Sequence, residues 1–84
     1  ALPATHPRLA ETRADLASLL QEMDRLEDSD ALFREAIAGL DRSRGDQHPF
    51  LGIVLNNHGN LLLRLGKANA SENAQRRALE IQRN

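Results

Sequence analysis

Three histidines are the side chains of this sequence best suited to metal binding or proton transfer. They are His6, His48 and His58. Two histidines that hold one metal ion from a single helix are spaced four residues apart, so that both project from the same face. No two of these histidines have that spacing. We therefore expect His6 and His48 to serve turns between helices, and His58 to be a part-buried core residue.

The remaining candidates for catalysis are an acidic cluster and four serines: Glu22, Asp24, Glu27, Asp28 and Asp30, and Ser18, Ser29, Ser43 and Ser71. The acidic cluster is typical of helix-terminus capping and of a solvated face. None of the serines lies in a nucleophile motif such as G-x-S-x-G, and no glycine-rich phosphate loop is present. The sequence predicts a protein that is not an enzyme and uses no metal and no cofactor.

Composition narrows the class of protein. The 84 residues fit one domain, near the lower limit for a self-sufficient core. The net charge of −1 provides no basic surface for nucleic acid and no polybasic membrane anchor. There is no cysteine, no run near the ~18 apolar residues of a membrane span, and no visible signal peptide. We expect a cytoplasmic protein and, because the chain starts without Met and ends in a helical run, a piece of a longer one.

The helix that should organise the fold lies between His48 and Gly66. Its apolar residues recur at helical spacing: Leu51, Val54, Leu55, Leu61, Leu62 and Leu65. Pro49 suits the first turn of a helix, and Gly66 suits the left-handed position that ends one. Two further apolar residues, Ile53 and Leu63, lie off the main stripe. We therefore expect this helix, over about 49–65, to lie in the middle of the protein.

Three more helices are predicted, over about 7–22, 25–43 and 68–82, with no strand, which makes the fold class all-α. Short connections between them require antiparallel neighbours. The second helix should begin at a capping box formed by Asp24 and Glu27. The residues expected to face inward are, in the first helix, Leu9, Leu16, Leu19, Leu20 and Met23; in the second, Leu26, Leu32, Phe33, Ala36, Ile37 and Leu40; and in the fourth, Ala74, Ala78, Leu79 and Ile81.

The sequence also contains an internal repeat. His6-Pro7 and His48-Pro49 are 48 − 6 = 42 residues apart. At the same offset the two halves match at pairs that include Leu9 and Leu51, Leu19-Leu20 and Leu61-Leu62, Ser29 and Ser71, Arg34 and Arg76, and Ala36 and Ala78. A fixed period of this size is typical of repeat proteins built from stacked units.

These motifs resemble those of tetratricopeptide repeats, in particular the 42-residue kind of kinesin light chains and many bacterial regulators. The matching segments are His48-Pro49, Leu55-Asn56-Asn57, Leu61-Leu62, Gly66-Lys67 and Arg77-Ala78-Leu79-Glu80-Ile81, together with His6-Pro7, Leu16-Ala17, Leu19-Leu20 and Arg34-Glu35-Ala36-Ile37. The resemblance implies one domain over 1–84, with one repeat over about 5–46 and a second over about 47–84. Each repeat would be a helical hairpin, and the two would stack as a short right-handed solenoid.

The last helix departs from this pattern, because Gln75 and Gln82 stand where the first copy has Phe33 and Leu40. One interpretation is a polar cap that faces solvent, as a terminal repeat requires. The other is that a further repeat would follow and the chain has been cut. Both interpretations stay open.

In this family the first helices of successive repeats line a concave groove for extended peptides. The resemblance places in the groove, from the first helix, Glu11, Ala14, Asp15, Ser18 and Gln21, and from the third, Ile53, Asn56, Asn57, Asn60, Leu63 and Arg64. The amides offer donors and acceptors to a peptide backbone, and Glu11 and Asp15 favour a ligand that is neutral or basic on that side. In the alternative arrangement, Ile53 and Leu63 pack on the small residues of the first helix.

The resemblance therefore implies a non-enzymatic scaffold or regulatory module that binds a peptide or a protein partner in its groove. The alternative is a structural unit that associates with other copies of itself or supports a neighbouring domain. The sequence does not identify the partner.

Overall fold

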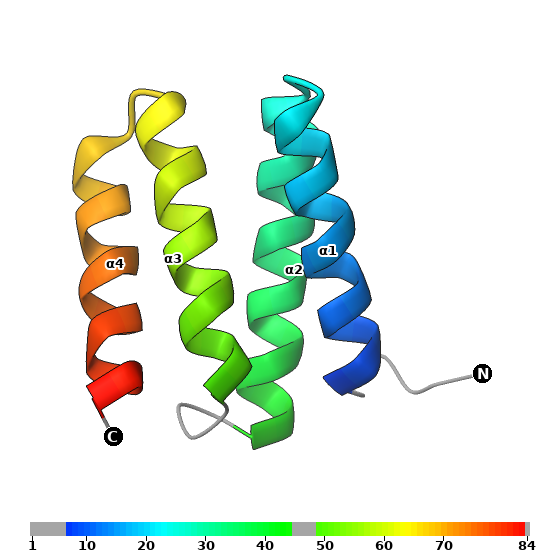
Figure 1. The fold of residues 1–84 in the computed structure, drawn as a ribbon, viewed down its shortest axis with the longest axis vertical. Coiled ribbons are helices and arrows are strands. Elements are labelled where there is room, and N and C mark those ends of the chain that lie inside the picture. Colours follow the sequence, from blue (N-terminus) through cyan, green and yellow to red (C-terminus); the bar gives the residue numbers. More distant parts are fainter. Residues whose placement is uncertain (1–6, 45–48, 84) are drawn as a thin grey trace.

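The computed structural model describes residues 7–44 and 49–83, which form four α-helices and no strand. Helix α1 spans Pro7–Glu22, α2 spans Leu26–Arg44, α3 spans Pro49–Arg64 and α4 spans Ala68–Arg83. Figure 1 shows them in chain order across the molecule, with neighbours antiparallel. The all-α prediction is confirmed, with every helix end within one residue of its expected place. The expected break at Gly45-Asp46 and the turn roles of His6 and His48 lie outside the described residues.

Helix α1 packs on α2 through small side chains. Ala10, Ala14 and Ala17 are all buried and belong to the core cluster. The expectation that Leu16, Leu19 and Met23 face inward is wrong, because these side chains are 46%, 50% and 57% exposed. Helix α1 has two apolar faces, and α2 covers the alanine face because small side chains let the two helices approach closely.

The middle of the molecule holds the largest fully buried side chains. They come from the two inner helices and include Phe33 and Leu40 of α2 and Leu51, Val54 and Leu61 of α3. Helix α3 is thus covered by α2 on one side and by α4 on the other (Figure 1). The prediction that α3 is the central helix of the fold is confirmed.

Helix α4 lies close against α3 at two glycines, Gly52 and Gly59. A Cβ atom added at Gly59 would be only 2.7 Å from the Gln75 Cγ atom and 3.3 Å from the Ser71 carbonyl oxygen. Within α4, Ser71 and Ala78 are buried. The expectation that Leu79 faces inward is wrong, since it is 53% exposed. The side of α4 away from α3 has no neighbouring helix among the described residues to cover such a side chain (Figure 1).

The two turns within the hairpins have the same hydrogen bonds at equivalent positions of the two repeats. After α1, the Arg25 amide donates to the Leu20 carbonyl and Asp24 to Gln21; after α3, Lys67 donates to Leu62 and Gly66 to Leu63. This pair of bonds is the Schellman motif, which requires a left-handed residue at the position after the helix. That residue is Asp24 in the first turn, with φ 62°, and Gly66 in the second, with φ 77°. The capping-box prediction for Asp24 is therefore wrong, because Asp24 closes α1 instead of starting α2.

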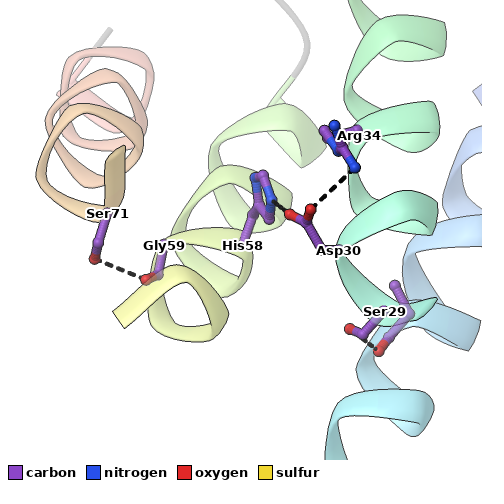
Figure 2. Close-up of polar contacts among 7 residues, drawn as sticks. Ser29, Asp30, Arg34, His58, Gly59 and Ser71 are labelled. Atoms are coloured by element: carbon purple, nitrogen blue, oxygen red, sulfur yellow. Dashed lines mark hydrogen bonds and ion pairs between the residues drawn. The ribbon is translucent and has the colours of Figure 1, made fainter. Parts of the chain in front are cut away.

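A buried serine joins the two helices of each hairpin. The Ser29 hydroxyl donates to the Ala17 carbonyl over 2.6 Å, and the Ser71 hydroxyl donates to the Gly59 carbonyl over 2.7 Å (Figure 2). Donor and acceptor again occupy equivalent positions of the two repeats. The serines matched in the sequence thus have a packing role.

Candidate functional site

A cavity of about 300 Å³ opens between α1 and α3, near the end where both helices finish. Its lining consists of polar and charged side chains: Ser18, Gln21, Glu22, Asn57, Asn60 and Arg64. The first three come from the last two turns of α1 and the others from the second half of α3. Because these two helices run parallel with α2 behind them (Figure 1), their side chains form two walls of one groove.

The structure brings together several of the residues placed in the groove by sequence, namely Ser18, Gln21, Asn57, Asn60 and Arg64. Glu11, Asp15, Ile53, Asn56 and Leu63 lie on the same two helices outside the cavity lining. Ala14 is only 4% exposed and belongs to the core, so its expected place in the groove is wrong. Glu22 lines the cavity, although the sequence indicates a helix-terminus role for it. Its spacing of four residues from Ser18 is the signal that would have included it.

The hydrogen bonds of the lining leave part of it free. The Arg64 guanidinium donates to the Gln21 carbonyl at 3.2 Å and to the Asp24 carboxylate at 2.5 Å, so it ties α3 to the turn after α1. Gln75 donates to the Asn60 side-chain oxygen at 3.1 Å, which leaves the Asn60 NH₂ group available. The Asn57 and Gln21 side chains make no hydrogen bond to another described residue. These amides have both donors and acceptors for a ligand.

Charge is unequal between the two walls. Of the acidic residues of α1, Glu22 lines the cavity, whereas Glu11 and Asp15 lie on the same helix outside the lining. None of the three forms an ion pair with another described residue. The α3 wall is neutral apart from Arg64, whose charge is offset by Asp24. Ile53 and Leu63 are 50% and 60% exposed on α3. The alternative in which these two side chains are covered by the first helix is not the arrangement found.

Behind the groove, one polar cluster lies in the contact between the hairpins. The His58 Nε2 atom is 2.7 Å from Asp30 Oδ1, and an Arg34 nitrogen is 3.1 Å from Asp30 Oδ2 (Figure 2). Because an ionised carboxylate can only accept hydrogen bonds, His58 donates here through Nε2. Its ring also lies 5.5 Å from that of Phe33, centroid to centroid. The prediction of a buried His58 is confirmed, with 8% of the residue exposed.

Asp30 is where the sequence interpretation fails. The sequence indicates a solvated acidic face for it, yet only 7% of it is exposed. The signal was available in the spacing of Leu26, Asp30, Phe33 and Ile37, which places this acid on the apolar stripe of its own helix.

Other kinds of site find no support in the part of the chain that the structure describes. Within residues 7–44 and 49–83, no three His, Asp or Glu side chains gather closely enough to hold a metal ion. Over the same residues, no helix combines the length and the apolar character needed to cross a bilayer.

Comparison with known families decides the classification. The family model described as Tetratricopeptide repeat matches residues 4–84. The chain belongs to the tetratricopeptide repeat family. Tetratricopeptide repeats generally mediate protein–protein interaction and are typically non-catalytic. The match does not test the resemblance to the kinesin-light-chain kind, and no curated protein matches the chain.

Proposed function

We propose that this tetratricopeptide repeat domain binds an extended segment of a partner protein in the groove between α1 and α3. The observation that carries the proposal is the cavity of about 300 Å³ and its free amides. A peptide backbone needs paired donors and acceptors, and Asn57, Asn60 and Gln21 present both kinds toward one space. Exposed Ile53 and Leu63 on the same helix offer apolar contacts for alternate side chains of the peptide.

The bound segment is proposed to be neutral or basic. Glu22 in the cavity lining, and Glu11 and Asp15 farther along α1, have no positive partner among the described residues, so a Lys or Arg of a segment bound along α1 would meet uncompensated carboxylates. An acidic segment would meet like charges there. Arg64 does not reverse this preference, because its charge is already taken up by Asp24.

The test is selection of binders from a random peptide library displayed against the immobilised chain. Peptides selected on the parent chain should lose roughly tenfold or more in affinity when Asn57→Ala and Asn60→Ala are combined, because each lost amide contact costs about 1 kcal/mol. Selected sequences should be rich in Lys and Arg relative to the library.

The matched control is Asn69→Ala combined with Asn73→Ala, two exposed asparagines of α4 away from the groove. Exposed Asn→Ala changes are neutral or mildly favourable to a helix, so both double variants should keep the parent helicity. Equal loss of binding in both variants, or selected peptides rich in Asp and Glu, would contradict the proposal.

A further inference from the structure

Glu22 leaves the cavity between α1 and α3 with a negative charge that no described residue offsets. It is the only carboxylate in the cavity lining, and it forms no ion pair with another described residue. The other charged group of the lining is the Arg64 guanidinium. Its charge is taken up elsewhere, because it donates to the Asp24 carboxylate and to the Gln21 carbonyl. A cation that enters the cavity would therefore meet an unpaired carboxylate.

The ends of two helices add to the negative potential of this site. Helices α1 and α3 both finish near the cavity, and the C-terminus of a helix carries a partial negative charge. Helix α3 has Arg64 in its last turn, but α1 has no basic residue in its own. The two repeats differ in sign here, because Glu22 stands at the position equivalent to Arg64 (22 + 42 = 64). The hydrogen bond from Arg64 to the Gln21 carbonyl already shows that a guanidinium is accepted at the end of α1.

The neutral side chains of the lining supply free oxygen atoms on both walls. Ser18 and Gln21 on α1, and Asn57 on α3, make no side-chain hydrogen bond to another described residue. Each of them has an oxygen that can accept a hydrogen bond from a ligand. Asn60 differs, because its oxygen already accepts from Gln75. Together with the carboxylate of Glu22, these oxygens border the cavity from two sides.

The size of the cavity suits one long side chain. Its volume of about 300 Å³ lies at the lower end of the ~300–1,000 Å³ of pockets for whole small molecules. We propose that the cavity is a specificity pocket for one arginine side chain of the bound segment, with the guanidinium paired to Glu22 and donating to the side-chain oxygens of Gln21 and Asn57. This inference rests on the proposed function, because it assigns one contact of a peptide bound in the same groove.

A guanidinium fits this lining better than an ammonium group or a carboxylate. Arg has five N–H donors in one plane and can pair with a carboxylate through two parallel hydrogen bonds, whereas Lys is a point charge with three donors. Acceptors on two walls match the wider array of donors. The guanidinium is also more weakly hydrated, so less hydration is lost when it enters the cavity. A carboxylate could accept from the amide NH₂ groups but would be repelled by Glu22.

The test begins with peptides selected on the parent chain from a library whose central residue is fixed as Arg and whose other positions are random. The best binders are then synthesised again with Lys, citrulline or Glu at that position, and fluorescence anisotropy measures their affinities. Citrulline keeps the shape of Arg but has no charge. The change to citrulline should weaken binding roughly fivefold or more, as expected for a two-bond ion pair at an accessible site. Lys should fall between Arg and citrulline, and Glu should bind most weakly.

Glu22→Gln locates the arginine, because it removes the charge and keeps the shape of the side chain. On this variant the change from Arg to citrulline should weaken binding by less than about twofold. The matched control is Glu80→Gln, which removes an exposed carboxylate from α4, away from the groove. This control should keep the full difference between Arg and citrulline. Glu22 is exposed as well, so circular dichroism should show the parent helicity for both variants.

The outcomes separate this inference from the proposed function. Equal affinities for Arg, Lys and citrulline, in peptides that still lose binding to the Asn57→Ala, Asn60→Ala variant, would leave the groove standing and overturn the arginine pocket. An arginine preference that survives Glu22→Gln, or that Glu11→Gln removes instead, would place the arginine outside the cavity and also overturn it. A library that yields no binders would overturn both proposals. An arginine preference that Glu22→Gln removes and Glu80→Gln keeps supports the pocket.

Discussion

At the scale of single residues, the contact between the hairpins depends on Asp30. Its carboxylate is buried between His58 and Arg34, and no other described side chain donates to it. A buried acceptor that loses a partner costs more than the bond itself contributed, because water cannot replace the donor. The sequence predicted a buried histidine but not its partner, since a repeat comparison places Leu16 at the position of His58 and suggests an apolar environment.

His58→Leu should therefore lower the free energy of unfolding by about 1–3 kcal/mol. The reason is that the Asp30 carboxylate would keep Arg34 alone while remaining buried. Chemical denaturation followed by far-ultraviolet circular dichroism measures it, since the chain has no Trp or Tyr.

The control for this prediction is the double variant Asp30→Leu, His58→Leu. Replacing both members of a buried polar pair by apolar residues is often neutral or stabilising, so the double variant should recover most of the loss. If His58→Leu alone were as stable as the parent chain, the buried Asp30 carboxylate would not need its hydrogen bond to His58.

At the scale of elements, α3 and α4 are held close by Gly59. An alanine there would bring its Cβ within 2.7 Å of Gln75 Cγ and 3.3 Å of the Ser71 carbonyl. Helix propensity favours Ala over Gly by about 1 kcal/mol, but the overlap forces the two helices apart. We expect Gly59→Ala to destabilise the chain by about 1–3 kcal/mol.

Gly52→Ala is the matched comparison on the same helix. Its new Cβ would lie 3.2 Å from Gln82 Cγ and 3.3 Å from Ile81 Cγ2, side-chain atoms near the end of α4 that can shift. The higher helix propensity of alanine should then outweigh the small packing adjustment, and the free energy of unfolding should stay equal or rise by about 0.5 kcal/mol. Equal melting temperatures for the two glycine variants would refute the close-packing argument.

The turns allow a reciprocal pair of substitutions. Asp24 holds a left-handed backbone that costs a non-glycine residue about 1 kcal/mol, while its exposed ion pair with Arg64 returns less than about 1 kcal/mol. Asp24→Gly should stabilise the chain slightly, by about 0.5 kcal/mol. Gly66→Asp should destabilise the chain by about 1 kcal/mol, because a non-glycine residue would have to hold the left-handed backbone there. No steric overlap adds to this cost, since a Cβ at Gly66 meets nothing within 4 Å. Thermal unfolding shows whether the melting temperature of each variant rises or falls relative to the parent chain. A change in the same direction for both variants would contradict the proposed backbone effect.

Helix positions were predictable, whereas the buried faces were less so. Proline at the starts of α1 and α3, Gly66 and the apolar spacing helped to place the helices, and every end lies within one residue of its expected position. The start of α2 lies there although the capping box that predicted it is not formed by Asp24. The prediction of which face of α1 is buried failed because the helix has both an alanine face and a leucine face. The spacing of apolar residues favours the more hydrophobic leucine face and takes no account of side-chain size. Which face is buried depends on how closely α2 can approach, a property of two helices together. The groove was partly predictable because it follows from the repeat, but the tie between Arg64 and the α1 turn depends on tertiary geometry.

At the scale of the whole molecule, equivalent residues differ by their place in the row of helices. Leu61 of α3 is fully buried, whereas Leu19, its equivalent in the first repeat, is half exposed on α1. Leu61→Ala should cost about 2–5 kcal/mol as a core truncation. Leu19→Ala should cost less than about 1 kcal/mol when measured on the dilute single chain. Urea midpoints at low micromolar concentration test the difference, and similar losses would mean that the ends of the molecule are as well covered as its middle.

The order of the four helices also has a kinetic consequence. Among the described helices only α2 and α3 have a helix on both sides, so their backbone amides become accessible to deuterium only when a hairpin separates from its neighbour (Figure 1). The outer helices can open singly, with less surface to detach. Deuterium uptake should therefore be slowest around Phe33 and Leu61 and fastest along α4, where Ser71 and Ala78 are the buried side chains. The slowest amides would report the unfolding of the entire chain, and those of α4 a local event.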